Sequence, residues 1–409
     1  MNNILKENFI WIKNYFFAFL KWLALGLIMG IIAGVIGAAF AHSIELVTHF
    51  RANYSHIIYF LPIGGLVITA IYKLCKTSGI GTNDVFEGVK TERHVPFLLA
   101  PSVFLGTVIT HLLGGSAGRE GAALQLGGSI AGFIGKAFRL KENARHILLM
   151  CGMGAFFSAL FGTPIGAFVF AIEVVSVGSF CSAALFPGIV SSLTAYFVAG
   201  MLNVKPERFL VSAIPKVSVL VVLKVVLIAV LGATLSIVFC KALHIFEKVF
   251  KKYFNNEYLR IFVGGCIIII LSLLFGKDYT GGGIDVINRI FEEGTVKPEA
   301  FLLKILFTSV TLAAGFKGGE IVPTIFIGAT LGGAASGFLG LDTAFSAAVS
   351  VAALFSGVTN CPLATIFLCL ELFGPEGIIF FALGSVISFL LSGSCSLYSS
   401  QRLEFSKVD

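Results

Sequence analysis

The sequence predicts an all-α polytopic membrane protein made of two related halves whose helices break inside the bilayer. Composition is the first observation, since 57% of the 409 residues are hydrophobic and only 12% are charged. Apolar runs of this kind are typical of membrane-spanning helices and exclude a soluble enzyme. The second observation is an internal repeat, and the third is a pair of acids placed where glycine-rich turns begin short apolar helices.

The first apolar stretch, residues 22–41, follows Lys6, Lys13 and Lys21. Its length of roughly 20 residues exceeds the apolar core of a secretory signal, so we interpret it as a membrane helix. Lysines on the N-terminal side place that end of the chain in the cytoplasm.

The repeat has an offset of about 200 residues. Three pairs of segments match in order: 79–88 with 280–294, 118–132 with 319–333, and 163–173 with 361–371. We therefore divide a single membrane domain into a first repeat over 1–216, a second over 217–393, and a C-terminal helix over 394–409 that carries Tyr398.

Each half begins with a long helix, over about residues 22–50 or 217–250, and ends with a helix pair broken at Pro164 or Pro362. Between the long helix and the broken pair lie a second apolar segment, a glycine turn with a short helix, and a glycine-led half-helix. Helices broken at corresponding positions of two halves indicate a binding site at the membrane midplane. Two basic loops, 136–146 and 247–260, are predicted to be cytoplasmic, which makes the halves inverted.

The half-helix of the first repeat starts at Gly118, Arg119, Glu120 and Gly121. An apolar run too short to cross the bilayer would present free amide N–H groups and the positive end of its dipole inside the membrane, which attracts anions. A carboxylate at that end competes with the anion and leaves when protonated, so Glu120 could couple an anion to a proton. Alternatively, Arg119 and Glu120 form a structural pair.

Glu320 occupies the equivalent start in the second repeat, within GGEIVP. A low dielectric favours the neutral form of such an acid, which suits proton carriage. It could instead cap its own helix outside the ion path. Tyr398 has a hydroxyl that could donate to an anion, or it could anchor the chain at the interface.

Other classes of function find little support in the sequence. The net charge of +7 is spread over short loops, so it predicts topology and lipid contact, and we expect no nucleic-acid partner. The eight cysteines form no CxxC pair or His/Cys ligand spacing, and we expect no metal and no cofactor. Without a Ser/His or paired-Asp constellation, the protein is not expected to be an enzyme.

These motifs resemble those of the CLC family of chloride channels and anion/proton antiporters over nearly the whole chain. GSAGREGA at 115–122 resembles the family's GREGP motif, with Ala122 in place of the proline. GGEIVP at 318–323 is similar to the GxFxP region, GIGTN at 79–83 takes the place of GSGIP, and Tyr398 is similar to the family's anion-coordinating tyrosine.

The resemblance implies a homodimer in the lipid bilayer, with an ion pathway in each subunit and anions held at helix N-termini. It makes Glu120 the gating glutamate, with Glu320 assisting in gating and proton transfer. The anion-binding residues that it implies are Gly79, Ile80, Gly81, Thr82, Asn83, Gly118, Arg119, Gly121, Ile321, Val322, Thr324 and Tyr398.

Several residues that depart from the chloride pattern resemble those of the fluoride-exporting branch of the family. Ile80, Asn83 and Ile321 replace a serine, a proline and a phenylalanine, and Val174 replaces the internal proton-transfer glutamate. The branch implies a fluoride/proton antiporter of the bacterial plasma membrane with both termini cytoplasmic. A chloride or broad-anion/proton antiporter and a passive anion channel remain alternatives, because Val322 stands where the branch has a threonine.

Overall fold

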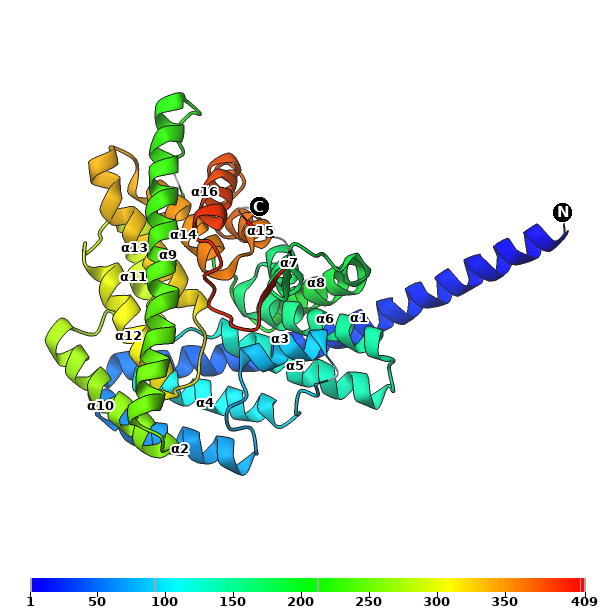
Figure 1. Ribbon diagram of the computed structural model, residues 1–409, viewed down its shortest axis with the longest axis horizontal. Helices are drawn as coiled ribbons and strands as arrows, with labels where there is room; N and C mark the ends of the chain where they lie inside the picture. Colours follow the sequence, from blue (N-terminus) through cyan, green and yellow to red (C-terminus); the bar gives the residue numbers. More distant parts are fainter. Residues whose placement is uncertain (1, 92, 212, 405, 408–409) are drawn as a thin grey trace.

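The computed structural model describes residues 2–91, 93–211, 213–404 and 406–407. Within this part of the chain the sequence folds into sixteen α-helices, so the all-α prediction is confirmed. Seven of the described helices are long and apolar enough to cross a membrane. Figure 1 shows them packed into one body, from which the start of the first helix extends.

The first half contains eight helices and two short 3₁₀ turns, Ser55–Phe60 and Ser182–Ala184. The helices are α1 (Asn2–Asn53), α2 (Leu61–Leu74), α3 (Thr82–Lys90), α4 (Leu99–Leu113), α5 (Glu120–Ala137), α6 (Glu142–Phe161), α7 (Pro164–Glu173) and α8 (Leu185–Met201).

The second half repeats this order. Its helices are α9 (Val219–Tyr253), α10 (Glu257–Phe275), α11 (Ile284–Glu293), α12 (Ala300–Ala314), α13 (Ile321–Leu339), α14 (Thr343–Thr359), α15 (Pro362–Phe373) and α16 (Ile378–Leu391). Equivalent helices also pack in equivalent ways: α5 lies on α6 as α13 lies on α14, and α1 lies on α8 as α9 lies on α16. The predicted duplication is therefore present in three dimensions.

The helix pairs break at the two predicted prolines. α6 is followed by Gly162, whose φ of 74° is left-handed, and α14 is followed by Asn360 with a φ of 56°. Pro164 and Pro362 then occupy the first position of the next helix, where the missing N–H costs nothing and the fixed φ suits a helix start. The same local chemistry thus interrupts both halves at the same place.

Two glutamates join the halves by capping each other's helices. Glu371, at the end of α15, accepts hydrogen bonds from Ile165 N at 3.0 Å and Gly166 N at 2.8 Å in the first turn of α7. Glu173, at the end of α7, accepts from the backbone N–H groups of Leu363 and Ala364 in the first turn of α15 at 3.1 and 2.7 Å. Each carboxylate therefore satisfies amide groups that its partner helix leaves free.

The C-terminal segment differs from the prediction of a helix over 394–409. Its described residues form turns, loop and a two-residue strand, β2 (Arg402–Leu403), which pairs in parallel with β1 (Ser176–Val177). Ser396 Oγ donates to Gln401 Oε1 at 2.7 Å and accepts from Tyr398 N at 3.1 Å. Serine side chains that bond locally in this way compete with helical hydrogen bonds. Residues 405 and 408–409 lie outside the described part.

Candidate functional site

The first turns of α5 and α13 meet in the interior of the protein. Gly118 N donates to Gly319 O at 2.7 Å, and Gly319 N donates to Gly118 O at 2.8 Å, forming an isolated antiparallel bridge between the two repeats. A Cβ atom on Gly319 would lie 2.9 Å from Gly121 Cα, closer than side chains tolerate. The glycines therefore allow two helix N-termini to approach each other backbone to backbone.

The two helices are longer than expected, at 18 and 19 residues. α13, where the repeat predicted a half-helix, is among the described helices long and apolar enough to span a membrane, whereas α5, the run predicted to be too short to cross, is not among them. Small residues along both helices, such as Gly127 and Gly328, allow close packing against α6 and α14. What makes their N-termini unusual is burial: Gly118 and Gly319 are both enclosed by protein.

Glu120 and Glu320 lie at the two joined helix starts. Glu120 is fully buried, and its Oε2 accepts a hydrogen bond from Arg119 N at 3.0 Å. No described residue forms a hydrogen bond with the buried Oε1 of Glu120 or with the buried Oε2 of Glu320. Buried polar atoms are usually satisfied, so two unpaired carboxylate oxygens at facing helix starts indicate a functional site.

Arg119 and Glu120 are not a closed structural pair. Arg119 Nε lies 3.6 Å from Glu120 Oε1, beyond hydrogen-bond range, whereas Arg119 Nη2 contacts Glu207 Oε1 at 2.6 Å. The first of these contacts is long and the second is a short charge-assisted hydrogen bond. The guanidinium is therefore committed mainly to Glu207.

Tyr398 is buried, with 3% of its surface exposed, which argues against an interfacial anchor. Its ring packs edge-on against Phe86 with the centroids 5.0 Å apart. The hydroxyl has no hydrogen-bond partner in the described part of the chain. An unpaired phenolic donor in the interior is suited to an anion, as the sequence suggested.

The segment over 79–83 is engaged with protein. Gly81 N donates to Asp84 Oδ2 at 2.8 Å, so the side chain of Asp84 caps α3 at the place where an anion was expected. Thr82 Oγ1 accepts from Gln125 Nε2 at 3.0 Å, and Asn83 Oδ1 accepts from Ser400 N at 3.2 Å. Anion binding by this segment, including Gly79 and Ile80, stays a prediction.

The predicted anion-binding residues after Glu320 also differ in whether they are free to bind an anion. Thr324 Oγ1 donates to Glu320 O at 2.8 Å within its own helix, so its proton is already used. Ile321 and Val322 are buried apolar side chains. Val322, Gly118 and Arg119 line a cavity, and Thr324 does not.

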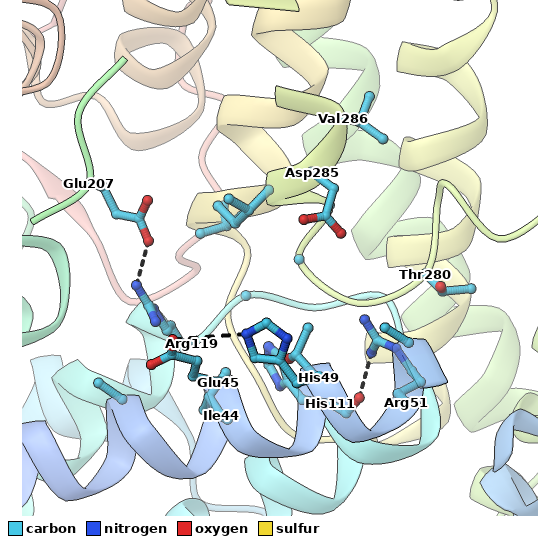
Figure 2. A pocket seen from close by; sticks show the side chains of 18 of the residues that line it. Ile44, Glu45, His49, Arg51, His111, Arg119, Glu207, Thr280, Asp285 and Val286 are labelled. Carbon is cyan, nitrogen blue, oxygen red and sulfur yellow. Dashed lines mark hydrogen bonds and ion pairs between the residues drawn. The ribbon is translucent and has the colours of Figure 1, made fainter. Parts of the chain in front are cut away.

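This cavity, which we call the vestibule, has a volume of about 640 Å³ and reaches the start of α5. Its walls come from the end of α1, the linker at 203–207, the loop before α11 and the first turns of that helix. Figure 2 shows Glu207 and Arg119 on one side of the vestibule and, on the other side, Arg51 from α1 below Asp285 from α11. Charged side chains of both signs thus surround the way to Glu120.

Two charged residues near this site, Lys304 and Glu207, were given no role from the sequence. Lys304 is fully buried in α12 and donates to Tyr279 O at 3.2 Å and Gly281 O at 2.7 Å in the loop before α11. Its position inside the apolar run 300–314 was a usable sign, because ionisable residues at membrane depth are costly. Glu207 lies in a linker between helices, and no sequence pattern distinguishes it there from an acid without a function.

Comparisons with known proteins agree with this arrangement. Residues 64–393 match the family model described as voltage gated chloride channel. The chain is 34% identical over 396 residues to the chloride/fluoride channel protein of Pseudomonas syringae pv. tomato, covering 95% of this chain and 87% of that protein. It is 27% identical to the H(+)/Cl(-) exchange transporter ClcA of Vibrio cholerae, with 92% and 88% covered.

Solved structures agree as well. The crystal structure of a CLC-type fluoride/proton antiporter superposes with a TM-score of 0.92 at 32% identity and covers 95% of this chain and 99% of that one. A slow cyanobacterial Cl⁻/H⁺ antiporter superposes with a TM-score of 0.80 at 20% identity, which supports the fold alone. With its inverted repeats and joined half-helices, the chain belongs to the voltage gated chloride channel (CLC) family.

Proposed function

We propose that this protein is a fluoride/proton antiporter that expels fluoride in exchange for protons. One observation carries the proposal: Glu120, which is fully buried, and Glu320, which is half-buried, each keep a buried carboxylate oxygen without a hydrogen-bond partner in the described structure, at two helix N-termini joined by backbone hydrogen bonds. The likeness to a fluoride/proton antiporter at 32% identity and nearly full coverage supports fluoride as the anion.

The geometry supports exchange through competition for one helix end. In this structure the Glu120 carboxylate accepts a hydrogen bond from Arg119 N, an amide that an anion would use. When a proton neutralises Glu120, its attraction to the positive helix end weakens, the side chain leaves and an anion enters. When the anion departs, the ionised carboxylate returns, so a proton moves one way as an anion moves the other.

Glu320 supplies the feature that suits fluoride. Fluoride is small and accepts hydrogen bonds strongly, so a protonated carboxyl can donate to it. The Oε2 of Glu320 lies 3.6 Å from the position of a Cβ on Gly121, at the start of the opposite half-helix. Glu320 thus faces the same centre as Glu120.

Two other functions in the same family make different predictions. A chloride or broad-anion/proton antiporter is supported by the likeness to the Vibrio cholerae exchanger, and it would move chloride as readily as fluoride. A passive anion channel would move fluoride without protons.

A dimer in the bacterial plasma membrane, with cytoplasmic termini, is part of the proposal. Large apolar side chains are exposed on α7, α8, α15 and α16, the helices that end each repeat. They include Ile165, Phe186, Ile189, Leu363, Phe367, Ile379 and Val386. These helices lie together around the capped pair α7 and α15, which suits a surface that a second copy would cover.

Proteoliposomes loaded with fluoride test the proposed function. A fluoride electrode should record efflux, a pH electrode should record proton movement in the opposite direction, and chloride should be transported more slowly. The variant Glu120→Gln should lose proton coupling because it cannot ionise. Fluoride release without opposing proton movement would refute antiport.

A further inference from the structure

Arg119 lies between two carboxylates, and only one of them holds it. Glu207 Oε1 accepts from Arg119 Nη2 at 2.6 Å, whereas Glu120 Oε1 lies 3.6 Å from Arg119 Nε. We propose that Glu207 is a positioning residue for the exchange reaction: it holds the Arg119 guanidinium off the gate, so that Glu120 can release the helix end to an anion. This inference rests on the proposed function and assigns a further residue to it.

The linker that carries Glu207 is fixed in place. Glu207 N donates to Phe161 O at 3.1 Å at the end of α6, and Phe209 N donates to Leu372 O at 2.9 Å near the end of α15. Pro206 packs against Gly162, where a side chain would meet it. Both repeats therefore hold the linker, and the carboxylate is presented to Arg119 as a rigid group.

The Nη2 group of Arg119 is fully engaged away from the gate, whereas its Nε and Nη1 groups keep their protons. Its Nη2 carries two protons, which go to Glu207 Oε1 and to Leu160 O at 3.1 Å. The Arg119 side chain is 17% exposed and the Glu207 side chain 21%, so water screens this pair only in part. With Glu207 ionised, the charge of Arg119 is compensated without Glu120.

Other charged or titratable groups around the gate do not replace Glu207. Glu120 is faced by Arg119 from its own segment, by Glu320 from the start of α13 and by Tyr398 from the C-terminal segment. Glu207 shares its linker with Lys205 and Arg208, and the vestibule adds His42, Glu45, His49, Arg51, His111, Lys277, Asp278, Asp285 and Arg289. Among the described residues, two acids lie within ion-pair distance of Arg119, namely Glu207 and Glu120. None of the other acids around the vestibule forms a described ion pair with Arg119.

Loss of the negative charge at Glu207 would leave the ionised gate as the sole counter-charge of Arg119. Glu120 would then be held ionised at its helix end, and an anion could not displace it easily. Glu207→Gln tests this directly, because it removes the charge and keeps an oxygen that can accept from Nη2. Fluoride/proton exchange should fall by at least about tenfold at neutral pH, which corresponds to about 1.4 kcal/mol in the barrier.

Three further readouts separate positioning from a structural role. Exchange by Glu207→Gln should recover toward the wild-type rate at acidic pH, where Glu120 is protonated despite the arginine, and the number of protons per fluoride should stay unchanged. Glu207→Asp, which keeps the charge, should remain nearer to wild type. Glu45→Gln, an exposed acid of the same vestibule that pairs only with histidines in the described structure, should leave exchange unchanged.

A crystal or cryo-EM structure of Glu207→Gln gives a result that does not depend on transport. The distance between Arg119 Nε and Glu120 Oε1 should shorten from 3.6 Å into hydrogen-bond range. An unchanged distance together with an unchanged pH profile would overturn the inference, and so would a folding defect that Glu207→Asp does not rescue. If the wild type exchanged no fluoride for protons, the proposed function would fail, while this distance would still decide the role of Glu207.

Discussion

Gly118 and Gly319, which are 201 residues apart in the numbering, donate a backbone hydrogen bond to each other, at 2.7 and 2.8 Å. The contact fixes the start of α5 against the start of α13, so the positive ends of two helix dipoles face one centre. Such an arrangement is electrostatically unfavourable by itself. It becomes favourable when a negative charge, from Glu120, Glu320 or an anion, lies between the two ends.

Gly319→Ala should abolish exchange while the fold persists. The new Cβ would press against the backbone of Gly121, 2.9 Å from its Cα, and force the two helix starts apart. Overpacking of this kind costs about 1–3 kcal/mol, which a membrane protein of this size can survive. Fluoride efflux and thermal unfolding in detergent measure the two effects.

Gly337→Ala is the matched control, since Gly337 lies in α13, the helix that Gly319 precedes, with nothing within 4 Å of the added methyl group. It should retain full exchange and gain a few tenths of a kcal/mol from higher helix propensity. Normal fluoride efflux by Gly319→Ala would show that the close approach at the bridge is dispensable.

Glu173→Gln and Glu371→Gln should each destabilise the protein by a similar amount. Each carboxylate accepts two backbone hydrogen bonds from the first turn of the other's helix, and a Gln side chain offers only one oxygen for the two amides. Loss of a helix cap costs about 1 kcal/mol, and an unpaired buried N–H adds to it. Thermal unfolding measures the change.

The exposed acid Glu376, three residues after the end of α15, provides the comparison. Glu376→Gln should leave the unfolding temperature within a degree or so of wild type, because surface substitutions usually change stability by less than about 0.5 kcal/mol. An equal loss in all three variants would mean that the reciprocal caps contribute nothing specific.

The sequence was sufficient to predict the breaks in the helices and the pairing of the two helix starts that carry Glu120 and Glu320. Proline and glycine act on their own backbone, so Pro164 and Pro362 could be placed without knowledge of packing. The duplication then required equivalent segments to occupy equivalent places, which brought the two helix starts together. Local chemistry and symmetry determined these features.

Contacts made by irregular segments could not be predicted in the same way. The approach of Glu207 to Arg119 depends on how a linker without periodicity crosses the end of α6. The C-terminal segment was expected as a helix, yet Ser396 and Ser400 bond to Gln401 and Asn83, and β2 pairs with β1. The partners of Ser400 and of β2 are distant in sequence, and no local pattern indicates them.

Tyr398→Phe should weaken fluoride binding without loss of stability. The hydroxyl has no hydrogen-bond partner in the described structure, so its removal breaks no protein contact, and the ring can keep its edge-on packing against Phe86. One hydrogen bond to an anion is worth about 1 kcal/mol or more, so the dissociation constant should rise by about fivefold to tenfold. Isothermal titration with fluoride measures the affinity.

Tyr72→Phe tests whether this effect is local. The Tyr72 hydroxyl is likewise buried and unpaired among the described residues, but its ring packs beside Lys317, whose Nζ lies 4.2 Å from the ring centroid, and not against Phe86. It should leave fluoride affinity unchanged. Equal weakening by both variants would remove Tyr398 from the anion site.

Glu320→Gln should slow fluoride/proton exchange by about a hundredfold or more, the usual effect of removing a group that transfers a proton. Its buried Oε2 has no hydrogen-bond partner in the described structure, so the neutral variant should fold normally, whereas Glu173→Gln should not reach wild-type stability. Parallel recordings with fluoride and pH electrodes measure the loss, and Glu292→Gln, an exposed acid at the end of α11, serves as the control. If Glu320 only caps its own helix, the variant will lose stability and keep its exchange rate. A role in the ion path predicts a lower exchange rate, whereas a role as a helix cap predicts lower stability. The transport assay and thermal unfolding together therefore distinguish the two roles.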